Sequence, residues 1–201
     1  IFNSLGSLRK LLRPTGDGAM LLDIVEEEAD RLDRIVRDLL DFARPNEPAL
    51  EPERLDGLLA DTIQAAQGDR IPAGVKVELE VPPDLPLVRI DARMIRQVLL
   101  NLVLNGMQAM PRGGTLRVRA ERDPADGRMV RVEFIDQGTG VPPELAPRIF
   151  QPFFTTKAAG TGLGLAVVKR FVDAHGGTIH FHSRQGEGTT FILRLPVDEA
   201  V

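Results

Sequence analysis

The stretch AAGTGLGL, residues 158–165, places three glycines at alternate positions directly before a strongly apolar helical pattern. Alternating glycines indicate that the backbone adopts positive φ angles, or that another group approaches it more closely than a Cβ atom allows. A phosphate chain at the start of a helix is one such group, because free N–H groups and the helix dipole favour anions there. A flexible turn before a helix is the alternative interpretation, and this stretch by itself does not separate the two.

The chain has 201 residues, of which 43% are hydrophobic and 27% charged, as is typical of a globular protein of one or two domains. It has no cysteine, which excludes disulfides, thiolate metal sites and cysteine-based catalysis. A net charge of −4 argues against nonspecific nucleic-acid binding. The sequence shows neither a bilayer-spanning apolar run nor a signal peptide. Because the chain opens with Ile1 rather than Met, we expect a fragment, with any membrane anchor upstream.

The first 44 residues show the pattern of two amphipathic helices joined by a turn at 14–18. In the second helix, apolar residues spaced alternately three and four apart form a heptad seam: Leu22, Val25, Ala29, Leu32, Val36, Leu39 and Ala43. Two such helices bury little alone, so we expect residues 1–43 to form a homodimer through a four-helix bundle. Packing of the hairpin against the rest of its own chain is the alternative.

Prolines at 45, 48 and 52 interrupt the helical pattern, and we assign residues 45–52 to a linker. The linker separates the hairpin, residues 1–44, from a second domain, residues 53–201. That domain has helical patterns at 55–66, at 91–107 with Asp91 as N-cap, and at about 162–174. Alternation predicts strands at 75–81 and 87–90, and two antiparallel hairpins, 116–120 with 130–134 and 178–183 with 190–195. The predicted fold class is α+β: a helical hairpin followed by an α/β sandwich with one helical layer over a sheet of antiparallel strands.

Two asparagines, Asn101 and Asn105, lie four residues apart and therefore on one face of a helix rich in leucine. Burying an unpaired amide costs about 1–3 kcal/mol, so both side chains must find a hydrogen-bond partner or a polar ligand. A bridge between two helices is the simpler interpretation. A polar ligand is the functional one.

A predicted strand ends at Ile135, and Asp136, Gly138 and Gly140 follow. This arrangement can place a carboxylate acceptor at the floor of a pocket with a bare backbone wall, which suits an exocyclic amine such as that of adenine. A turn in which Asp136 caps Gly138 is the alternative. The segment 148–157 has the aromatic and basic residues of a mobile flap, although core packing is favoured for Phe150 and Phe153. For the Gly-x-Gly-Thr stretch at 186–189, a hairpin turn is the simpler interpretation.

The order and spacing of five motifs resemble the nucleotide-binding boxes of sensor histidine kinases. The motifs are Asn-x-x-x-Asn at 101–105, Asp-x-Gly-x-Gly at 136–140, Phe-Phe-Thr-Thr-Lys at 153–157, Gly-x-Gly-x-Gly at 160–164 and Gly-x-Gly-Thr at 186–189. The resemblance covers residues 53–196, and residues 1–44 resemble the dimerisation and phosphotransfer hairpin of that family. Gln-Ala-Met after the second asparagine and a short lid are similar to the nitrogen-regulation subgroup. The wider group with gyrase and the Hsp90 chaperones usually has a glutamate general base where this chain has Asn101.

The resemblance implies ATP and Mg²⁺ as cofactors. It implies that Asn105 coordinates Mg²⁺ and that Asn101 supports the metal or the phosphates, both as catalytic residues. At the adenine end it implies Asp136, Gly138, Gly140 and Thr189. At the phosphate end it implies Lys157, Gly160, Gly162, Leu163 and Gly164. It thereby favours phosphate binding for the glycine stretch quoted first.

The resemblance also implies a cytoplasmic kinase core, which includes the cytosolic part of a membrane-anchored sensor. The core would phosphorylate its own histidine and pass the phosphoryl group to an aspartate of a response-regulator receiver domain. Residues 1–5 align with the tail of the family's acceptor box, so we expect the acceptor histidine just ahead of Ile1. None of His175, His180 and His182 has an acceptor context. A catalytically inactive, nucleotide-sensing dimer scaffold is the alternative, and a free-standing ATPase is disfavoured because Asn101 is no carboxylate.

Overall fold

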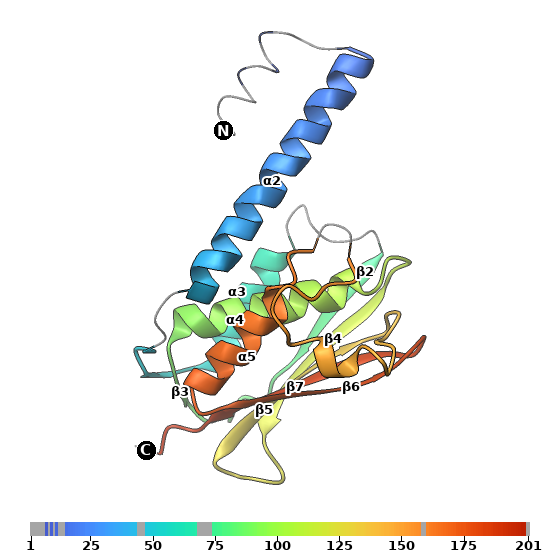
Figure 1. Cartoon of the computed structure of the whole chain (residues 1–201). Helices are drawn as coiled ribbons and strands as arrows, with labels where there is room; N and C mark the ends of the chain where they lie inside the picture. Colours follow the sequence, from blue (N-terminus) through green and yellow to red (C-terminus); the bar gives the residue numbers. More distant parts are fainter. Residues whose placement is uncertain are drawn as a thin grey trace.

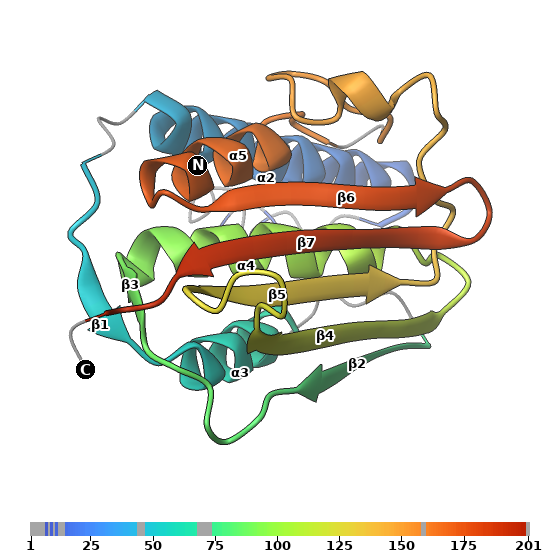
Figure 2. The ribbon, with the colours of Figure 1, turned by 90° about the horizontal axis from the view of Figure 1, so that it is seen from below.

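The computed structural model describes residues 7, 9, 11, 15–43, 47–67, 74–157 and 160–199. A long helix, α2 (Asp17–Ala43), projects from a domain in which three helices cover one face of a five-stranded sheet (Figures 1 and 2). The predicted fold class, N-terminal helices followed by an α/β sandwich, is confirmed. Within the described residues, no helix is long and apolar enough to cross a bilayer.

The predicted first arm of the hairpin lies mostly outside the described residues, but Arg9, which the structure describes, contacts α2. Its guanidinium contacts two carboxylates of α2, Asp23 at 2.7 Å and Glu26 at 2.6 Å. The hydrogen bond and the charge of Asp23, joined by the charge of Glu26, raise the pKa of Arg9. Arg9, which precedes the turn, therefore lies beside α2. α2 also contacts α5 (Gly164–Ala174) of the second domain.

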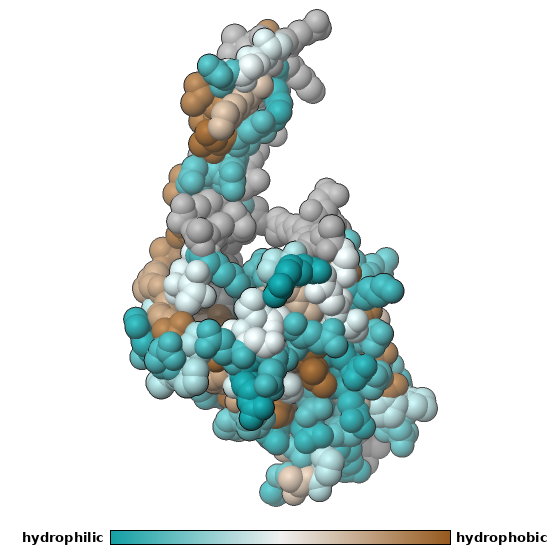
Figure 3. Space-filling model, turned by 90° about the vertical axis from the view of Figure 1, so that its right-hand side faces the viewer, coloured by the Kyte–Doolittle hydropathy of each residue, from teal (hydrophilic) through white to brown (hydrophobic). Residues whose placement is uncertain are grey.

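The heptad seam of α2 is largely open to solvent. Leu22 is buried, whereas four seam residues further along are between 45% and 59% exposed: Val25, Leu32, Val36 and Leu39. Figure 3 shows apolar side chains gathered along this projecting arm. Much of this apolar seam is therefore exposed in the single chain.

The sheet has the strand order β2-β4-β5-β7-β6. Its strands are β2 (Val75–Glu80), β4 (Gly114–Arg122), β5 (Met129–Asp136), β6 (Thr178–Arg184) and β7 (Gly188–Pro196). The hairpins β4–β5 and β6–β7 are antiparallel, as predicted. The expectation of an antiparallel sheet is wrong for β2, which pairs parallel to β4. The chain between these two strands crosses over through β3 (Val88–Ile90) and α4 (Ala92–Gln108), so it re-enters the sheet in the same direction.

The helical layer consists of α3 (Leu55–Ala66), α4 and α5, with α4 in contact with both neighbours. Asp91 caps α4, as predicted, because its carboxylate accepts the N–H groups of Arg93 and Met94. Five aliphatic residues of α4 are completely buried: Ile95, Val98, Leu99, Leu102 and Val103. Each contributes about 1.5–3 kcal/mol relative to exposure. This packing fixes the polar face of α4. The third helix starts at Gly164, two residues later than predicted.

A short second sheet joins the linker to this domain. β1 (Glu51–Glu53) pairs antiparallel with β3, with Glu51 opposite Ile90. Two residues of the segment that we assigned to the linker, 51 and 52, therefore lie in a strand. The end of the domain reaches the same place, because the Asp198 N–H donates to the Leu87 carbonyl at 2.9 Å.

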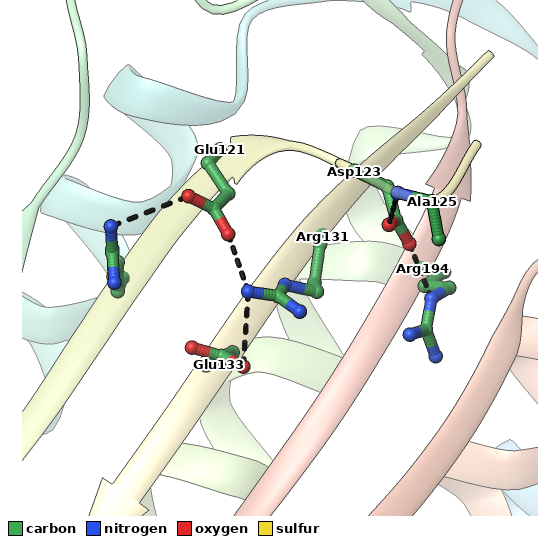
Figure 4. Close-up of polar contacts among 7 residues, drawn as sticks. Glu121, Asp123, Ala125, Arg131, Glu133 and Arg194 are labelled. Atoms are coloured by element: carbon green, nitrogen blue, oxygen red, sulfur yellow. Dashed lines mark hydrogen bonds and ion pairs between the residues drawn. The ribbon is translucent and has the colours of Figure 1, made fainter. Parts of the chain in front are cut away.

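The sheet face away from the helices carries ion pairs across its strands (Figure 4). Arg131 of β5 lies between Glu121 and Glu133, and Arg194 of β7 contacts Asp123. A hydrogen bond from the Ala125 N–H lowers the pKa of Asp123 against the effect of its burial, and Arg194 adds to the lowering. This face is therefore polar, and the apolar core lies on the helical side only.

Candidate functional site

Asn101, on the polar face of α4, connects that helix to the start of α5. Its side-chain amide donates to the Gly164 carbonyl at 3.2 Å. A Cβ atom on Gly164 would lie in ordinary contact with this amide, 3.7 Å away. The bridging interpretation therefore holds for Asn101. It also places Asn101 at a helix N-terminus, where the first N–H groups lack intrahelical acceptors.

Asn105, one turn later, meets a cation. The Lys157 ammonium donates to the Asn105 Oδ1 at 3.0 Å and to the Gln108 Oε1 at 2.8 Å. Loss of hydration lowers the pKa of Lys157, and the carboxylate of Asp136 acts in the opposite direction. We did not predict Gln108, although its position three residues after Asn105, on the same helical face, was the available signal. Two amide oxygens thus converge on one positive charge.

Asp136 is buried at the end of β5, and its two oxygens have different surroundings. Oδ1 accepts the N–H groups of Gly138 at 2.8 Å and Thr189 at 3.1 Å. Among the described residues, no group donates to Oδ2. Burial raises the pKa of Asp136 and outweighs the two N–H groups and the charge of Lys157. The turn interpretation is therefore correct for Oδ1, and Oδ2 keeps its capacity to accept a further hydrogen bond.

Thr189 is held in place by a residue that we did not predict, Ser183 of β6. The Ser183 hydroxyl lies 2.9 Å from the Thr189 hydroxyl and 3.0 Å from the Gly188 carbonyl. It also accepts the N–H of Val141 at 2.8 Å. Ser183 pairs with Thr189 in the β6–β7 ladder, so the hairpin register was the signal that could have identified it. Ser183 thereby joins the Gly-x-Gly-Thr turn to the segment after Asp136.

Gly138 and Gly140 contact the protein's own backbone. A Cβ atom on Gly138 would lie 2.5 Å from the Ala109 carbonyl oxygen, and one on Gly140 would lie 2.2 Å from that of Arg184. Gly140 also has a φ of 67°, a backbone angle that residues with a Cβ atom rarely adopt. These contacts connect the end of β5 to α4 and to the β6–β7 turn. Both glycines therefore have a packing reason that needs no ligand.

The backbone of the glycine stretch packs closely against the segment that precedes it. A Cβ atom on Gly162, which has a φ of 70°, would lie 2.4 Å from the carbonyl carbon of Phe153. One on Gly160 would lie 2.4 Å from the Thr155 hydroxyl. Leu163 is completely buried at the N-cap of α5. The stretch thus combines close backbone contact with a helix start, and residues 158 and 159 lie outside the described part.

The segment between Arg148 and Lys157 is anchored at one end. The Phe150 ring packs edge-on against Phe181 at 6.0 Å, and the Arg148 guanidinium lies 4.4 Å from the centre of the Phe154 ring. The core interpretation is right for Phe150 and wrong for Phe153, which is 66% exposed and has a φ of 64°. A left-handed phenylalanine is an uncommon, strained conformation. The segment therefore has a packed base and an exposed tip.

The predicted site residues thus gather around the C-terminal half of α4, the start of α5, the last residue of β5 and the first residues of β7. The three histidines lie elsewhere: His175 is buried, and His180 and His182 are exposed on β6. Within the described residues, no group of histidine and acidic side chains could hold a metal ion.

Residues 90–199 match the family model of histidine kinase-, DNA gyrase B- and HSP90-like ATPases. The chain is 39% identical over 183 residues to the sensor histidine kinase ZraS of Escherichia coli K12, and 35% identical over 177 residues to the histidine-protein kinase AtoS of the same organism. These alignments cover 91% and 88% of this chain but 39% and 29% of the relatives, so the chain spans less than half of their length.

A similar solved structure is that of full-length ShkA in complex with AMPPNP. It superposes with a TM-score of 0.78 and 29% identity, covering 98% of this chain and 43% of ShkA. The match includes the N-terminal helical part as well as the sandwich. Over most of its length the chain is similar to sensor histidine kinases, and it belongs to the histidine kinase-, DNA gyrase B- and HSP90-like ATPase family.

Proposed function

We propose that this chain binds Mg-ATP and transfers the γ-phosphoryl group to a histidine ahead of residue 1, from which a response-regulator aspartate takes it. Asp136 Oδ2 would accept the adenine amine, because it is the oxygen that receives no N–H from the described residues. The N-terminus of α5, with Gly162 and Leu163, would face the phosphates. Lys157 would leave Asn105 and reach the phosphate end.

The residues around Asn105 fit a magnesium ion by their chemistry. Mg²⁺ prefers oxygen ligands completed by water and phosphate. The amide oxygens of Asn105 and Gln108 already point at one cation, the ammonium of Lys157. Mg²⁺, when bound, would neutralise charge on the phosphates. Asn105 would hold it, and Gln108 would assist from the next turn of α4.

The observation that carries transfer rather than hydrolysis is the amide of Asn101. A free-standing ATPase needs a group that removes a proton from water. Asn101 cannot do this, and its amide is already engaged with the Gly164 carbonyl. Phosphoryl transfer needs mainly positioning and charge neutralisation, which the amides, the lysine and the helix start supply. The site is therefore suited to act as the donor half of a kinase.

We also propose a homodimer through residues 1–43, a receiver domain as the second partner, and a cytoplasmic location for this core. The exposed apolar side chains of α2 support the dimer, because several of them lie on the projecting arm (Figure 3). A second copy would cover them in a four-helix bundle.

The experiment that tests the function compares two chains with γ-labelled ATP. One is the 201-residue chain, and the other adds roughly ten native upstream residues, two to three further helical turns. We expect both to bind Mg-ATP and only the longer chain to acquire acid-labile phosphate. An upstream histidine exchanged for glutamine is the matched control and should abolish the label.

Two outcomes would contradict this proposal in different ways. Labelling of the 201-residue chain would show that the acceptor is misplaced, with His175, His180 or His182 then to be mapped. A longer chain that binds ATP but stays unlabelled would support the nucleotide-sensing scaffold instead.

A further inference from the structure

The segment that leads into the ATP-binding domain, described from residue 47 onward, contacts Asp91. The Ala49 N–H donates to the Asp91 Oδ2 at 3.3 Å. Two residues further on, β1 pairs with β3, and Glu51 lies opposite Ile90, the residue directly before Asp91. The linker therefore runs alongside Asp91 before the chain enters α3.

The other oxygen of Asp91 caps the N-terminus of α4. Oδ1 accepts the N–H groups of Arg93 at 3.0 Å and Met94 at 3.1 Å. Burial by itself would raise the pKa of Asp91. The N–H groups of Met94 and Ala49, together with Arg93, outweigh it and lower this pKa. One carboxylate thus caps the helix that carries Asn101 and Asn105 with one oxygen, and holds the linker with the other.

His175 connects the same residue to the end of α5. The Asp91 N–H donates to the Nε2 of His175 at 3.0 Å, and the Nδ1 lies 2.6 Å from the Phe171 carbonyl. Nε2 must lack a proton in order to accept, and a carbonyl can only accept, so the ring is neutral with its proton on Nδ1. His175 is buried and 84 residues from Asp91 in sequence. Neither the ATP site nor an acceptor role uses this histidine.

Both helices of this junction lead to the ATP site. α4 starts at Asp91 and carries Asn105 fourteen residues later, about 21 Å along the helix axis. α5 starts at Gly164, beside Asn101, and ends at His175. Packed helices move as rigid bodies, so a change in how the linker meets Asp91 reaches the asparagines without unfolding the domain.

We propose that Asp91 and His175 are a pair of positioning residues that fix the linker against the ends of α4 and α5. They thereby set the direction in which α2 leaves the ATP-binding domain. The pair acts on the geometry between ATP and the histidine hairpin, and for its effect on transfer it rests on the function proposed above. The hydrogen-bonded junction itself is a property of the described chain and can be tested without any transfer.

The first test separates the cap from the linker contact by changing Asp91→Ser in the full chain. Serine is as good an N-cap as aspartate, but its single, shorter oxygen cannot also reach the Ala49 N–H. We expect amide exchange at residues 49–53 to become about tenfold faster, with the melting temperature and ATP affinity close to those of the unchanged chain. In the longer chain with the acceptor histidine, the rate of self-labelling should fall about tenfold at an unchanged KM for ATP.

Asp126→Ser is the matched control, because Asp126 also accepts a backbone N–H, that of Arg128, in a turn away from the linker. It should change neither linker exchange nor labelling. Unchanged exchange at 49–53 in Asp91→Ser would overturn the junction. Faster exchange with an unchanged labelling rate would overturn the positioning role. If the unchanged longer chain is never labelled, the proposed function fails, and the exchange result still decides the junction.

The second test uses the two amide replacements of His175. In His175→Gln the side-chain oxygen can lie where Nε2 lies and accept the Asp91 N–H, whereas the shorter side chain of His175→Asn cannot reach it. We expect the glutamine variant to keep the slow exchange at residues 49–53 and the asparagine variant to lose it. His180→Gln, an exposed histidine on β6, is the control. Equal exchange in the two His175 variants would contradict a role for the Asp91–His175 bond.

Discussion

The change Asp136→Asn separates nucleotide recognition from folding. Asparagine keeps an oxygen that can accept the N–H groups of Gly138 and Thr189, as Oδ1 does now. It replaces Oδ2 with an NH₂ group, so that a donor faces the adenine amine. The substitution therefore removes one hydrogen bond to the ligand and leaves the two that order the protein.

The expected loss is that of a hydrogen bond to a charged group, about 1.5–3 kcal/mol. At 1.4 kcal/mol for each factor of ten, ATP and ADP should both bind about 10- to 150-fold more weakly. The free energy of unfolding should not fall together with the nucleotide affinity. Burial raises the pKa of the folded Asp136 above its unfolded value, so its charge destabilises the folded state at neutral pH and does not below the unfolded pKa. Removing that charge should leave the free energy of unfolding at pH 7 unchanged or slightly larger.

Calorimetric titration with ATP and ADP, together with denaturant unfolding, measures both quantities. Asp123→Asn is the matched control, since Asp123 is also a buried carboxylate but pairs with Arg194 on the outer face of the sheet. It should lower stability without changing nucleotide affinity. An Asp136→Asn protein with the affinity of the unchanged chain would refute the assignment of Oδ2 to adenine. A variant that binds more weakly only because it unfolds would refute the separation of the two roles.

Three further changes test other parts of the molecule. Asn105→Ala should reduce the Mg²⁺-dependent gain in ATP affinity by about tenfold or more, because it removes a metal ligand. Titrations with and without chelator would measure this gain, and an undiminished gain would contradict a metal role. A fragment of residues 51–201 should be monomeric by light scattering and the whole chain dimeric, and a dimeric fragment would place the interface elsewhere. Gly140→Ala should lower stability by more than 2 kcal/mol, about 1–2 kcal/mol from its positive φ and the rest from the Arg184 carbonyl. The control Gly186→Ala has positive φ but open space, and should lose only the first part in denaturant unfolding.

The elements that a local pattern determines could be predicted from the sequence. Periodic leucines and the Asp91 cap defined α4, and alternation defined both hairpins. The parallel pairing of β2 could not be read in this way, because strand direction depends on where the intervening chain runs. β1 is too short, with Pro52 inside it, to show alternation.

The candidate site divides in the same manner. The order of the glycine and asparagine motifs indicated ATP binding. It did not indicate which close contacts require a glycine at each position. For Gly140 the reason is a carbonyl of Arg184, distant in the sequence, and no local pattern contains it. Gln108 was hidden because an exposed glutamine at a helix end is ordinary until Lys157 is placed beside it. Phe153 was interpreted as a core residue because phenylalanine is large and apolar. Its positive φ and its exposure show that it is not.

The place of β7 in the sheet has a consequence for protein synthesis. β7 lies between β5 and β6, yet among the five strands of this sheet it is the last to leave the ribosome, and its Thr189 supplies one of the N–H groups that hold Asp136. α2, by contrast, is complete about 150 residues earlier in translation. A message cut short before the codon for Gly188 would therefore yield a product that keeps α2, the helix through which we propose dimerisation, but lacks the strand that holds Asp136. If the proposed dimer forms, such a product could pair with a full-length copy while its own Asp136 is not held in place.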